Sequence, residues 1–354
     1  MGKLEGNGMS SKTIKCVVWD LDQTLWDGIL TEDGALSLRP KVREIVEELD
    51  RRGILQSICS KNDYEPAMKQ LKEFQLEKYF VYPQINWGPK SENIKKIREA
   101  LNFGIDTFAF IDDQIFEREE VAYAIPEVLC IDANSLDRLL DRKEMLPQYV
   151  TEDSRNRRLL YLNDMERNQI EESFQGTPEE FLKTLDLKFT VAPADEKDLL
   201  RVEELTVRTH QLNSTGTQYS YEDLLKLIHS EDHIVLIAQM DDKYGQYGKI
   251  GISVIEKHED YWDIKLLLMS CRVISKGVGA VMLKYIMKLA LEHGVRLYAD
   301  FVPTDRNRIM YITYKFGGFK EIKNEGGYIR LEADLLQKGE YPDYLTLIDE
   351  FKNE

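Results

Sequence analysis

Apolar runs alternate with amphipathic stretches over residues 9–135 of the chain. The apolar runs are short and bounded by charged or turn residues, which predicts buried strands at 14–19, 54–59, 107–111 and 128–131. Between them, the stretches 40–52 and 91–103 carry apolar residues at helical spacing. Gly53 and Gly104 follow these two stretches and are predicted to end the helices. Strands that alternate with helices predict an α/β domain with a parallel sheet, and ligands of such sheets bind beyond the carboxyl ends of the strands.

The hydrophobic pattern changes after this first domain. Residues 136–185 are charged, have a helical period and carry no strand signal, so they predict a helical connector in which a capping box at Thr177 opens one helix. Residues 186–335 predict a second domain, with strands at 233–240, 249–257, 262–273 and 296–302, helices at 277–293 and 307–316, and a polar hairpin loop at Asp241–Gly248. Residues 1–8, ahead of a second methionine, are interpreted as an expression leader, and 336–354 as a C-terminal tail.

Composition narrows the possible functions. The 354 residues include 63 acidic against 47 basic side chains, a net charge of −16, which argues against a general nucleic-acid binder. No apolar run is long enough to cross a bilayer and no export signal follows Met1, so we expect a cytoplasmic protein that does not bind membranes. The four widely spaced cysteines form neither a CxxC zinc site nor a disulfide framework. All five histidines occur at or after His210, so the first domain works without imidazole.

Reactive side chains follow the predicted strands of the first domain. Asp20 and Asp22 come directly after the first strand, where one carboxylate can attack phosphorus and the other can protonate the leaving oxygen and later activate water. The further candidates are a hydroxyl and a lysine for phosphoryl oxygens and an acidic pair suited to Mg²⁺: Ser60, Lys90, Asp112 and Asp113. Each feature alone has an ordinary alternative as a solvated turn or a surface charge. Together, and in this order, they predict a phosphoryl-transfer site.

This ordered set resembles the haloacid dehalogenase superfamily of phosphotransferases, through Asp20, Asp22, Thr24, Ser60, Lys90, Asp112 and Asp113. The resemblance implies a doubly wound parallel sheet, Asp20 as the nucleophile and Asp22 as the general acid and base. It also implies Mg²⁺ held by Asp20, the Asp22 carbonyl and Asp112, with Asp113 beside them. The spacings from Asp22 to Ser60 and from Ser60 to Lys90 leave no room for a large cap domain. We therefore expect a capless, open site for a macromolecular or carrier-bound substrate, or a lid supplied by the second domain.

Longer stretches are similar to the FkbH-like branch of that superfamily: Trp19–Gly28, Cys59–Asp63, Phe110–Gln114, Phe116–Glu119, Thr209–Asn213, Ser270–Val273 and Phe316–Phe319. Members of this branch load a glyceryl unit from D-1,3-bisphosphoglycerate onto the phosphopantetheine thiol of an acyl carrier protein in polyketide pathways, such as tetronate or methoxymalonyl routes. The resemblance thus implies both of these partners. The substrate-binding candidates in these stretches are Thr24, Lys61, Asn62 and His210.

Cysteine chemistry adds a hypothesis about the acyl half of that reaction. Cys59 comes directly before Ser60 at a strand end, so its thiol is a candidate to carry the glyceryl group before the carrier receives it. The alternative is a small buried core residue that the alternation of the strand points away from Ser60. The other three cysteines are expected in the core, within apolar strands: Cys16, Cys130 and Cys271.

The second domain is similar to the GCN5-related acetyltransferase fold, which is an α+β fold. The stretch Arg272–Ala280 matches the family's pyrophosphate loop at Gly277, Gly279 and Ala280, but Ile274 stands where the pattern has Arg or Gln, so acetyl-CoA is not supported as a cofactor. We interpret this domain as a module that docks the carrier and positions its pantetheine, with Arg272, Lys276, Arg306, Arg308 and Lys315 as candidates for a basic face. His210, Asn213 and Thr215 form a polar cluster near the domain boundary.

Three alternative functions remain open from the sequence. The first is a capless phosphatase or phosphotransferase with a regulatory acetyltransferase-like domain. The second is an acyl-CoA N-acyltransferase, which the incomplete pyrophosphate loop disfavours, and the third is a carrier-binding scaffold without catalysis, which the complete set of phosphotransferase motifs disfavours.

Overall fold

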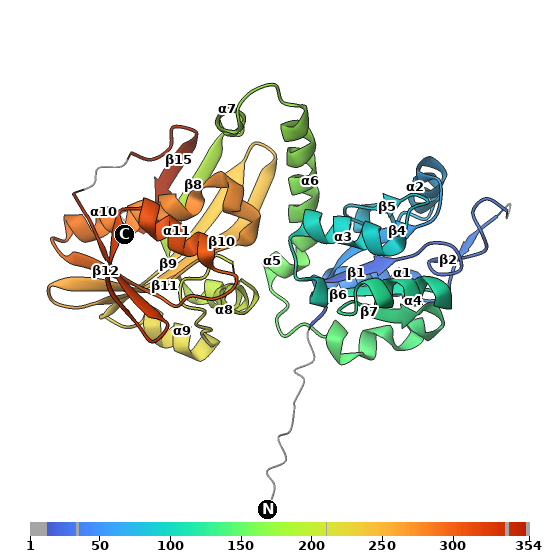
Figure 1. Ribbon diagram of the computed structural model, residues 1–354, viewed down its shortest axis with the longest axis horizontal. Coiled ribbons are helices and arrows are strands. Elements are labelled where there is room, and N and C mark those ends of the chain that lie inside the picture. Colours follow the sequence, from blue (N-terminus) through green and yellow to red (C-terminus); the bar gives the residue numbers. More distant parts are fainter. Residues whose placement is uncertain (1–12, 33–34, 210, 337–339, 352–354) are drawn as a thin grey trace, which may run out of the picture. The chain divides into compact units, whose positions relative to one another are not determined.

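A computed structural model describes residues 13–32, 35–209, 211–336 and 340–351. The chain forms two compact units, Met1–Met165 and Glu166–Glu354 (Figure 1). The division lies within helix α6 (Arg157–Ser173), inside the segment for which the sequence predicts a helical connector. The proposed leader, 1–8, lies outside the described residues.

The first unit is built on a five-stranded sheet with the strand order β5-β4-β1-β6-β7. The strands are β1 (Cys16–Trp19), β4 (Leu55–Ser60), β5 (Gln84–Ile85), β6 (Phe108–Asp112) and β7 (Leu129–Asp132). All neighbouring pairs are parallel, which confirms the predicted parallel α/β class. A short antiparallel hairpin, β2 (Trp26–Asp27) and β3 (Ser37–Leu38), follows β1.

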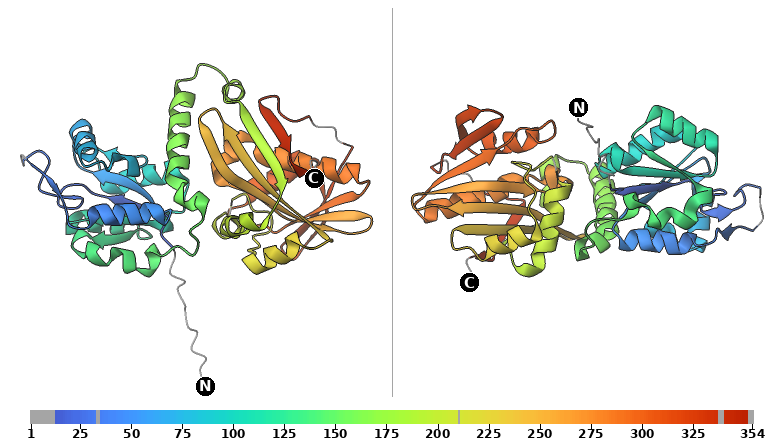
Figure 2. Two further views of the ribbon diagram at one scale, coloured as in Figure 1. Left: turned by 180° about the vertical axis from the view of Figure 1, so that it is seen from behind. Right: turned by 90° about the horizontal axis from the view of Figure 1, so that it is seen from below.

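Helices cover both faces of this sheet, so the sheet is doubly wound (Figures 1 and 2). The helices are α1 (Val42–Arg51), α2 (Tyr64–Glu73), α3 (Lys90–Leu101) and α4 (Ile115–Ala124). Apolar residues of α1 and α2 join one core cluster, and those of α3 and α4 join a second. Short 3₁₀ helices complete the unit: η1 (Glu77–Tyr79), η2 (Ile105–Thr107), η3 (Ala133–Asp141) and η4 (Lys143–Met145).

The two expected glycine stops behave differently. Gly53 follows α1 with a φ of 68° and packs so closely on the Ser154 backbone that a Cβ would lie 2.4 Å from its oxygen, so this stop is confirmed. Gly104 does not stop α3, because its φ is −64°. Asn102 ends that helix instead, in the left-handed conformation with a φ of 52°. Asparagine tolerates this conformation better than most residues. The predicted helix stop at Gly104 is therefore wrong.

The segment 136–185 is helical, as predicted, and no strand lies in it. It contains α5 (Glu152–Arg155), the whole of α6, and α7 (Pro178–Lys183). The capping box at Thr177 is confirmed: its hydroxyl accepts a hydrogen bond from the Glu180 N–H, and its own N–H donates to the Glu180 carboxylate over 2.7 Å.

The second unit carries an eight-stranded mixed sheet with the order β13-β14-β12-β11-β10-β9-β8-β15. The strands are β8 (Leu187–Pro193), β9 (His233–Asp242), β10 (Gly245–Lys257), β11 (Tyr261–Met269), β12 (Arg296–Phe301), β13 (Phe319–Glu325), β14 (Tyr328–Ala333) and β15 (Leu345–Asp349). The pairs β11–β12 and β15–β8 are parallel, and the remaining pairs are antiparallel.

Helices lie on both faces of this second sheet as well (Figure 2). The helical elements are η5 (Glu196–Asp198), α8 (Leu199–Arg208), α9 (Tyr221–Ile228), η6 (Cys271–Lys276), α10 (Val278–Glu292) and α11 (Arg308–Phe316). Residues of α10 and α11 belong to the largest apolar cluster, and those of α8 and α9 to a separate one. The mixed sheet with these helices confirms the α+β class.

Several details of the second unit differ from the expectations. The expected C-terminal tail, 336–354, contains β15, which pairs with β8 in the sheet. The strands β9 and β10 continue to Asp242 and Gly245, which pair with each other, so the expected loop Asp241–Gly248 is mostly strand with a turn at Lys243-Tyr244. The strand β11 ends at Met269, and Cys271 begins a 3₁₀ helix rather than lying in a strand. Among the described helices, none combines the length and the apolar character needed to cross a membrane.

Candidate active site

Three neighbouring strands of the first unit end in the polar residues that the sequence singled out. Asp20 follows β1, Ser60 is the last residue of β4 and Asp112 is the last residue of β6; all three are buried. Because β4, β1 and β6 are parallel neighbours, their carboxyl ends meet at one edge of the sheet. Lys90, the first residue of α3, reaches the same point: its Nζ lies 2.7 Å from Asp20 Oδ1 and 2.5 Å from Asp112 Oδ2.

The charges of this cluster do not balance, because two buried carboxyls share one ammonium group. Burial raises the pKa of Asp20 to about 7, against the opposing effect of Lys90, and the nearby Asp112 adds to the shift. Burial likewise raises the pKa of Asp112. Burial opposes the charge of Lys90, but the two carboxylates outweigh it and hold the pKa of the amine above its usual value. Perturbed titratable groups concentrated at a strand edge are typical of a functional site.

A hard cation fits this edge of the sheet. Carboxylate oxygens of Asp20, Asp112 and Asp113 lie within 4.8 Å of one another. Oxygen ligands with excess negative charge are what Mg²⁺ prefers in proteins, so the donor set fits the metal that the sequence predicts. Thr24 holds this group together, because its hydroxyl accepts from the Asp113 N–H over 3.1 Å and lies 3.5 Å from Asp113 Oδ1. The structure thus places Thr24 as a partner of the acidic pair.

Asp22 is engaged by other parts of the unit. Its Oδ1 accepts hydrogen bonds from Trp26 Nε1 over 2.8 Å and from the Leu30 N–H over 3.1 Å. Its Oδ2 accepts from Asn62 Nδ2 over 3.0 Å, and the same amide lies 3.3 Å from Ser60 Oγ. Asn62, a predicted substrate-binding residue, thus joins Asp22 to Ser60. The roles of Trp26 and Leu30 were not predicted, although Trp26 lies only four residues after Asp22.

Lys61 and α4 are tied together beside the site. The Lys61 ammonium lies 2.6 Å from Glu117 Oε1, and Glu117 is buried although it is acidic. Glu120, one turn further on, accepts hydrogen bonds from the Ser91 backbone N–H and the Ser91 hydroxyl, at the start of α3. The contacts of Glu117 and Glu120 could not be predicted from sequence spacing, because each joins segments that are far apart in the chain.

Cys59 lies in the apolar core. It is fully buried, belongs to the cluster that contains Val18 and Ile94, and its Sγ lies 3.6 Å from the Lys90 carbonyl oxygen. Burial raises the pKa of its thiol, which disfavours the thiolate. The geometry favours the core interpretation of Cys59 over the covalent one. Cys16 is buried in the same cluster, and Cys130 lies half-buried in β7.

Exposed apolar side chains lie on the loops and helix starts that follow β4, β5 and β6. We call Tyr64, Trp87, Ile115 and Phe116 the apolar rim. Trp87 is 65% exposed and Phe116 is 68% exposed, values that are high for large apolar residues. The indole of Trp87 donates to Asp63 Oδ1 over 3.0 Å, which joins the loop after β5 to the start of α2.

In the second unit, residues of the expected pyrophosphate loop form contacts with other parts of the same unit. Gly277 has a φ of 68° at the start of α10, and the Tyr344 hydroxyl donates to the Lys276 carbonyl over 3.2 Å. Lys276 is buried, 3.8 Å from the Glu171 carboxylate and over the Phe181 ring. Arg272 Nη2 donates to the Tyr247 carbonyl over 2.7 Å. Arg272 and Lys276, two of the five candidates for the predicted basic face, are therefore engaged in contacts within the unit.

A segment of the chain fills the gap where β11 and β12 diverge. Ser214 N donates to Leu267 O over 3.0 Å, Met269 N donates to Leu212 O over 2.9 Å, and Val302 N donates to Ser214 O over 2.9 Å. Asn213 and Thr215 belong to this segment, and the Asn213 Oδ1 caps the N–H groups of residues 215 and 216. The predicted polar cluster is therefore structural at these two positions; His210 lies outside the described residues.

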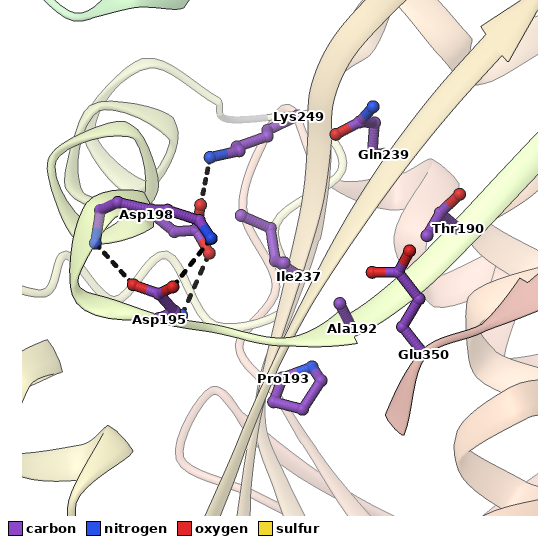
Figure 3. Close-up of a pocket in the computed structure, with 10 residues that line it drawn as sticks. Thr190, Ala192, Pro193, Asp195, Asp198, Ile237, Gln239, Lys249 and Glu350 are labelled. Carbon is purple, nitrogen blue, oxygen red and sulfur yellow. Dashed lines mark hydrogen bonds and ion pairs between the residues drawn. The ribbon is translucent and has the colours of Figure 1, made fainter. Parts of the chain in front are cut away.

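The second unit also has a cavity of about 300 Å³ beside β8, β9 and β10 (Figure 3). Lys249 and Asp198 form an ion pair at its wall, and Gln239 and Glu350 line it. None of the residues predicted for the site belongs to this cavity. Three acids and two lysines line it, so its charges are closer to balance than those of the cluster in the first unit.

Comparison with known proteins agrees with a phosphatase-like part of the chain. No protein-family model matches. Human magnesium-dependent phosphatase 1 is 26% identical over 119 residues, covering 28% of this chain and 68% of the human protein. Among solved structures, the N-terminal part of a Bacteroides fragilis protein containing a phosphatase domain complexed with Mg is 28% identical, with a TM-score of 0.31; the match covers 43% of this chain and 40% of that one.

Structures of acetyltransferases are also similar to part of this chain. The Escherichia coli ribosomal-protein-S18-alanine N-acetyltransferase is 14% identical over 43% of this chain and 97% of its own, with a TM-score of 0.34. The strand orders of the two sheets define the fold class of each unit. The chain thus combines a parallel α/β unit with a mixed α+β unit, and part of it is similar to a magnesium-dependent phosphatase.

Proposed function

We propose that this chain is a cytoplasmic, Mg²⁺-dependent glyceryltransferase and phosphatase. It would remove phosphate from D-1,3-bisphosphoglycerate and load the glyceryl unit onto the phosphopantetheine thiol of an acyl carrier protein, in tetronate or related polyketide biosynthesis. The observation that carries the catalytic part is the buried cluster of Asp20, Asp112 and Lys90 at the strand ends. The carrier and the glyceryl unit come from the resemblance of the surrounding stretches to the FkbH-like branch.

The phosphatase half uses the two carboxyls after β1. The Asp20 carboxylate attacks the phosphorus at C3, and the bond from phosphorus to the C3 oxygen breaks as Asp22 gives that oxygen a proton. Water then attacks the aspartyl phosphate, Asp22 takes up the proton, and phosphate leaves with Asp20 restored. Ser60 and Lys90 donate to phosphoryl oxygens. Bound Mg²⁺ would be held by Asp20 and Asp112 and would lower the charge repulsion between phosphate and carboxylate.

The acyl half transfers the glyceryl group to sulfur. The carrier thiol attacks the C1 carbonyl carbon of the acyl phosphate, the carbon–sulfur bond forms, and the carbon–oxygen bond to phosphate breaks. The thiol proton leaves with the phosphate, so the products are the glyceryl thioester and inorganic phosphate. Because Cys59 is buried in the apolar core, we propose direct transfer to the carrier thiol rather than a Cys59 thioester.

The surroundings of the site support a carrier-bound substrate. The first sheet has no large cap domain inserted after β1 or β4, and the apolar rim is exposed. A carrier that presents its substrate on a long arm needs this access, whereas small free substrates are commonly enclosed. We therefore propose that Trp87 and Phe116 contact the carrier. The Lys61 ammonium, held at 36% exposure beside Glu117, would meet anionic groups of the substrate or carrier.

Intact-protein mass spectrometry tests this function. The chain is mixed with Mg²⁺, 1,3-bisphosphoglycerate generated in place and a holo acyl carrier protein. A glyceryl adduct on the carrier, lost in Asp20→Asn and retained in Cys59→Ser, is expected. An adduct on the enzyme that disappears in Cys59→Ser would overturn direct transfer. A carrier that stays unmodified while phosphate is released would overturn the transferase activity.

The second candidate is a capless phosphatase with a regulatory acetyltransferase-like unit. The observation that favours it is the filled gap between β11 and β12, together with the engaged Lys276 and Arg272, because these leave few features for a ligand in the second unit. Asp20-dependent phosphate release without carrier loading is its distinguishing result.

A further inference from the structure

The carboxylate of Asp22 is held from three sides by N–H groups of other segments. Trp26 Nε1 and the Leu30 N–H both donate to Oδ1, and Asn62 Nδ2 donates to Oδ2. Both oxygens are therefore engaged, which fixes the plane of the carboxyl group as well as its position. A reacting proton must travel along a defined direction to the leaving oxygen, so the orientation of this group matters as much as its presence.

The backbone turns after Leu21, and this turn places the indole of Trp26 beside the Asp22 carboxylate. Thr24, Leu25 and Trp26 turn their N–H groups toward the Leu21 carbonyl, and Gln23 adopts a φ of 53°. The Trp26 side chain is fully buried against the apolar core, where its ring lies 6.1 Å from that of Phe74. Packing therefore fixes the indole before the substrate arrives, and its N–H is directed at the carboxylate.

Asn62 makes the opposite contact and extends it to a second functional group. It is buried, and its amide nitrogen lies within hydrogen-bond distance of both Asp22 Oδ2 and Ser60 Oγ. Ser60 in turn forms a side-chain hydrogen bond with Asp20. The two carboxyls of the proposed mechanism are thus connected through Asn62 and Ser60.

We propose that Trp26 and Asn62 are positioning residues that orient the Asp22 carboxyl toward the leaving oxygen. This inference rests on the proposed phosphoryl transfer, and it assigns Trp26 a role in the reaction beyond core packing. It does not depend on the identity of the carrier or of the acyl group. Neither residue touches the reacting phosphorus in this assignment; each acts through Asp22.

The leaving group offers a readout that core packing alone does not move. An alkyl phosphate, such as glycerol 3-phosphate, needs a proton on its leaving oxygen, whereas p-nitrophenolate leaves without one. We expect Trp26→Phe to lower kcat/KM for glycerol 3-phosphate by about tenfold and for p-nitrophenyl phosphate by less than about twofold. Asn62→Ala also removes the contact with Ser60 Oγ, so it should lower both values, with the larger loss for glycerol 3-phosphate. Trp26→Phe keeps most of the buried ring and removes the indole N–H.

Trp19→Phe is the matched control. Trp19 is also fully buried, and its Nε1 donates to Gln56 Oε1 over 3.2 Å, away from Asp22. Urea unfolding identifies conditions in which all three variants are folded. We expect Trp19→Phe to leave the ratio of the two kcat/KM values as in the wild type.

Three outcomes overturn the proposal, and they are distinguishable. An equal loss on both esters in Trp26→Phe and Asn62→Ala would leave only a packing role. A change of the ratio in Trp19→Phe as large as in Trp26→Phe would make the effect unspecific. If the wild type hydrolyses neither ester in an Asp20-dependent way, the proposed phosphoryl transfer fails, and the positioning role fails with it.

Discussion

Both units bury charged side chains, but a buried cluster of acids around one ammonium group differs from a buried one-to-one ion pair. In the first unit, Lys90 stands between Asp20 and Asp112, and a third acid, Asp113, lies within reach of the same oxygens. In the second unit, the buried Arg167 makes two hydrogen bonds to the buried Asp242, at 2.7 and 2.8 Å. The chain thus pairs one acid with one base in the second unit and concentrates acids in the first.

A larger network of the second unit lies between these two cases. Arg330 lies between Asp263 and Asp300, at 2.5 and 2.9 Å, and Lys265 adds a second cation to Asp300 at 3.1 Å. Glu256 also lies 3.4 Å from Lys265, so three acids meet two bases in this network. In a buried ion pair the attraction between the two charges offsets part of their desolvation cost, whereas an acidic excess is stabilised only when a cation or a proton joins it. In the candidate site three acids meet a single ammonium group, which is a larger acidic excess than in the network of the second unit.

Removing the nucleophile gives the largest expected effect. Asp20→Asn should lower the hydrolysis of phosphate esters by on the order of 10⁴-fold or more, because the attacking oxygen is lost. The matched control is Asp132→Asn, at the end of the neighbouring strand β7, where Asp132 pairs with Arg118 at 2.9 Å. Steady-state release of phosphate measures both. Residual activity of Asp20→Asn comparable to that of Asp132→Asn would contradict the assignment.

Breaking the balanced pair of the second unit should cost stability instead of activity. Asp242→Asn removes a buried carboxylate that pairs with the buried Arg167, which should lower the free energy of unfolding by about 3 kcal/mol. The exposed pair Arg296–Asp260, 3.0 Å apart, is the control, and Asp260→Asn should cost less than about 1 kcal/mol. Urea denaturation followed by tryptophan fluorescence compares the two variants. Equal costs would show that burial of the pair does not matter.

Magnesium should stabilise the unbalanced cluster. At a concentration about 100 times its dissociation constant, a ligand that binds only the folded state adds about 2.7 kcal/mol. Thermal unfolding of the wild type with Mg²⁺ and with EDTA should show this gain, and Asp112→Asn should lose most of it because one acidic ligand is gone. A gain of the same size in Asp112→Asn would place the ion elsewhere.

Local signals in the sequence were enough to predict much of the fold. The four strands and two helices predicted for the first unit are present within a few residues of their expected bounds, because apolar periodicity is a local property. The strand-end position of Asp20, Ser60 and Asp112 follows from the same reasoning, since parallel neighbours align their carboxyl ends. The capping box at Thr177 was also visible, because all of its members lie within four residues.

Contacts between distant segments could not be predicted in the same way. The pairing of Lys61 with Glu117 and the filling of the gap beside β11 by Ser214 depend on tertiary packing, which one sequence does not reveal. The extension of β9 and β10 through a polar stretch was missed because backbone pairing overrode the composition of the loop. Pairing of the final strand β15 with β8 had no local signal either.

The smallest expected effect concerns a glutamate that pairs with two arginines on the surface of the first unit. Glu48 accepts hydrogen bonds from Arg51 and Arg52, each over 2.7 Å, and these bonds lower its pKa from 4.5 to about 2. A depressed pKa means that the ionised form stabilises the folded state, so the contribution is full above pH 4.5 and is lost as the pH falls toward 2. Since Arg51 is more than half exposed, the contribution is about 0.5–1 kcal/mol. Urea unfolding of the wild type and Glu48→Gln should differ by this amount at pH 7 and by less at pH 3. A difference that grows on acidification would mean that the two arginines do not stabilise the ionised carboxylate.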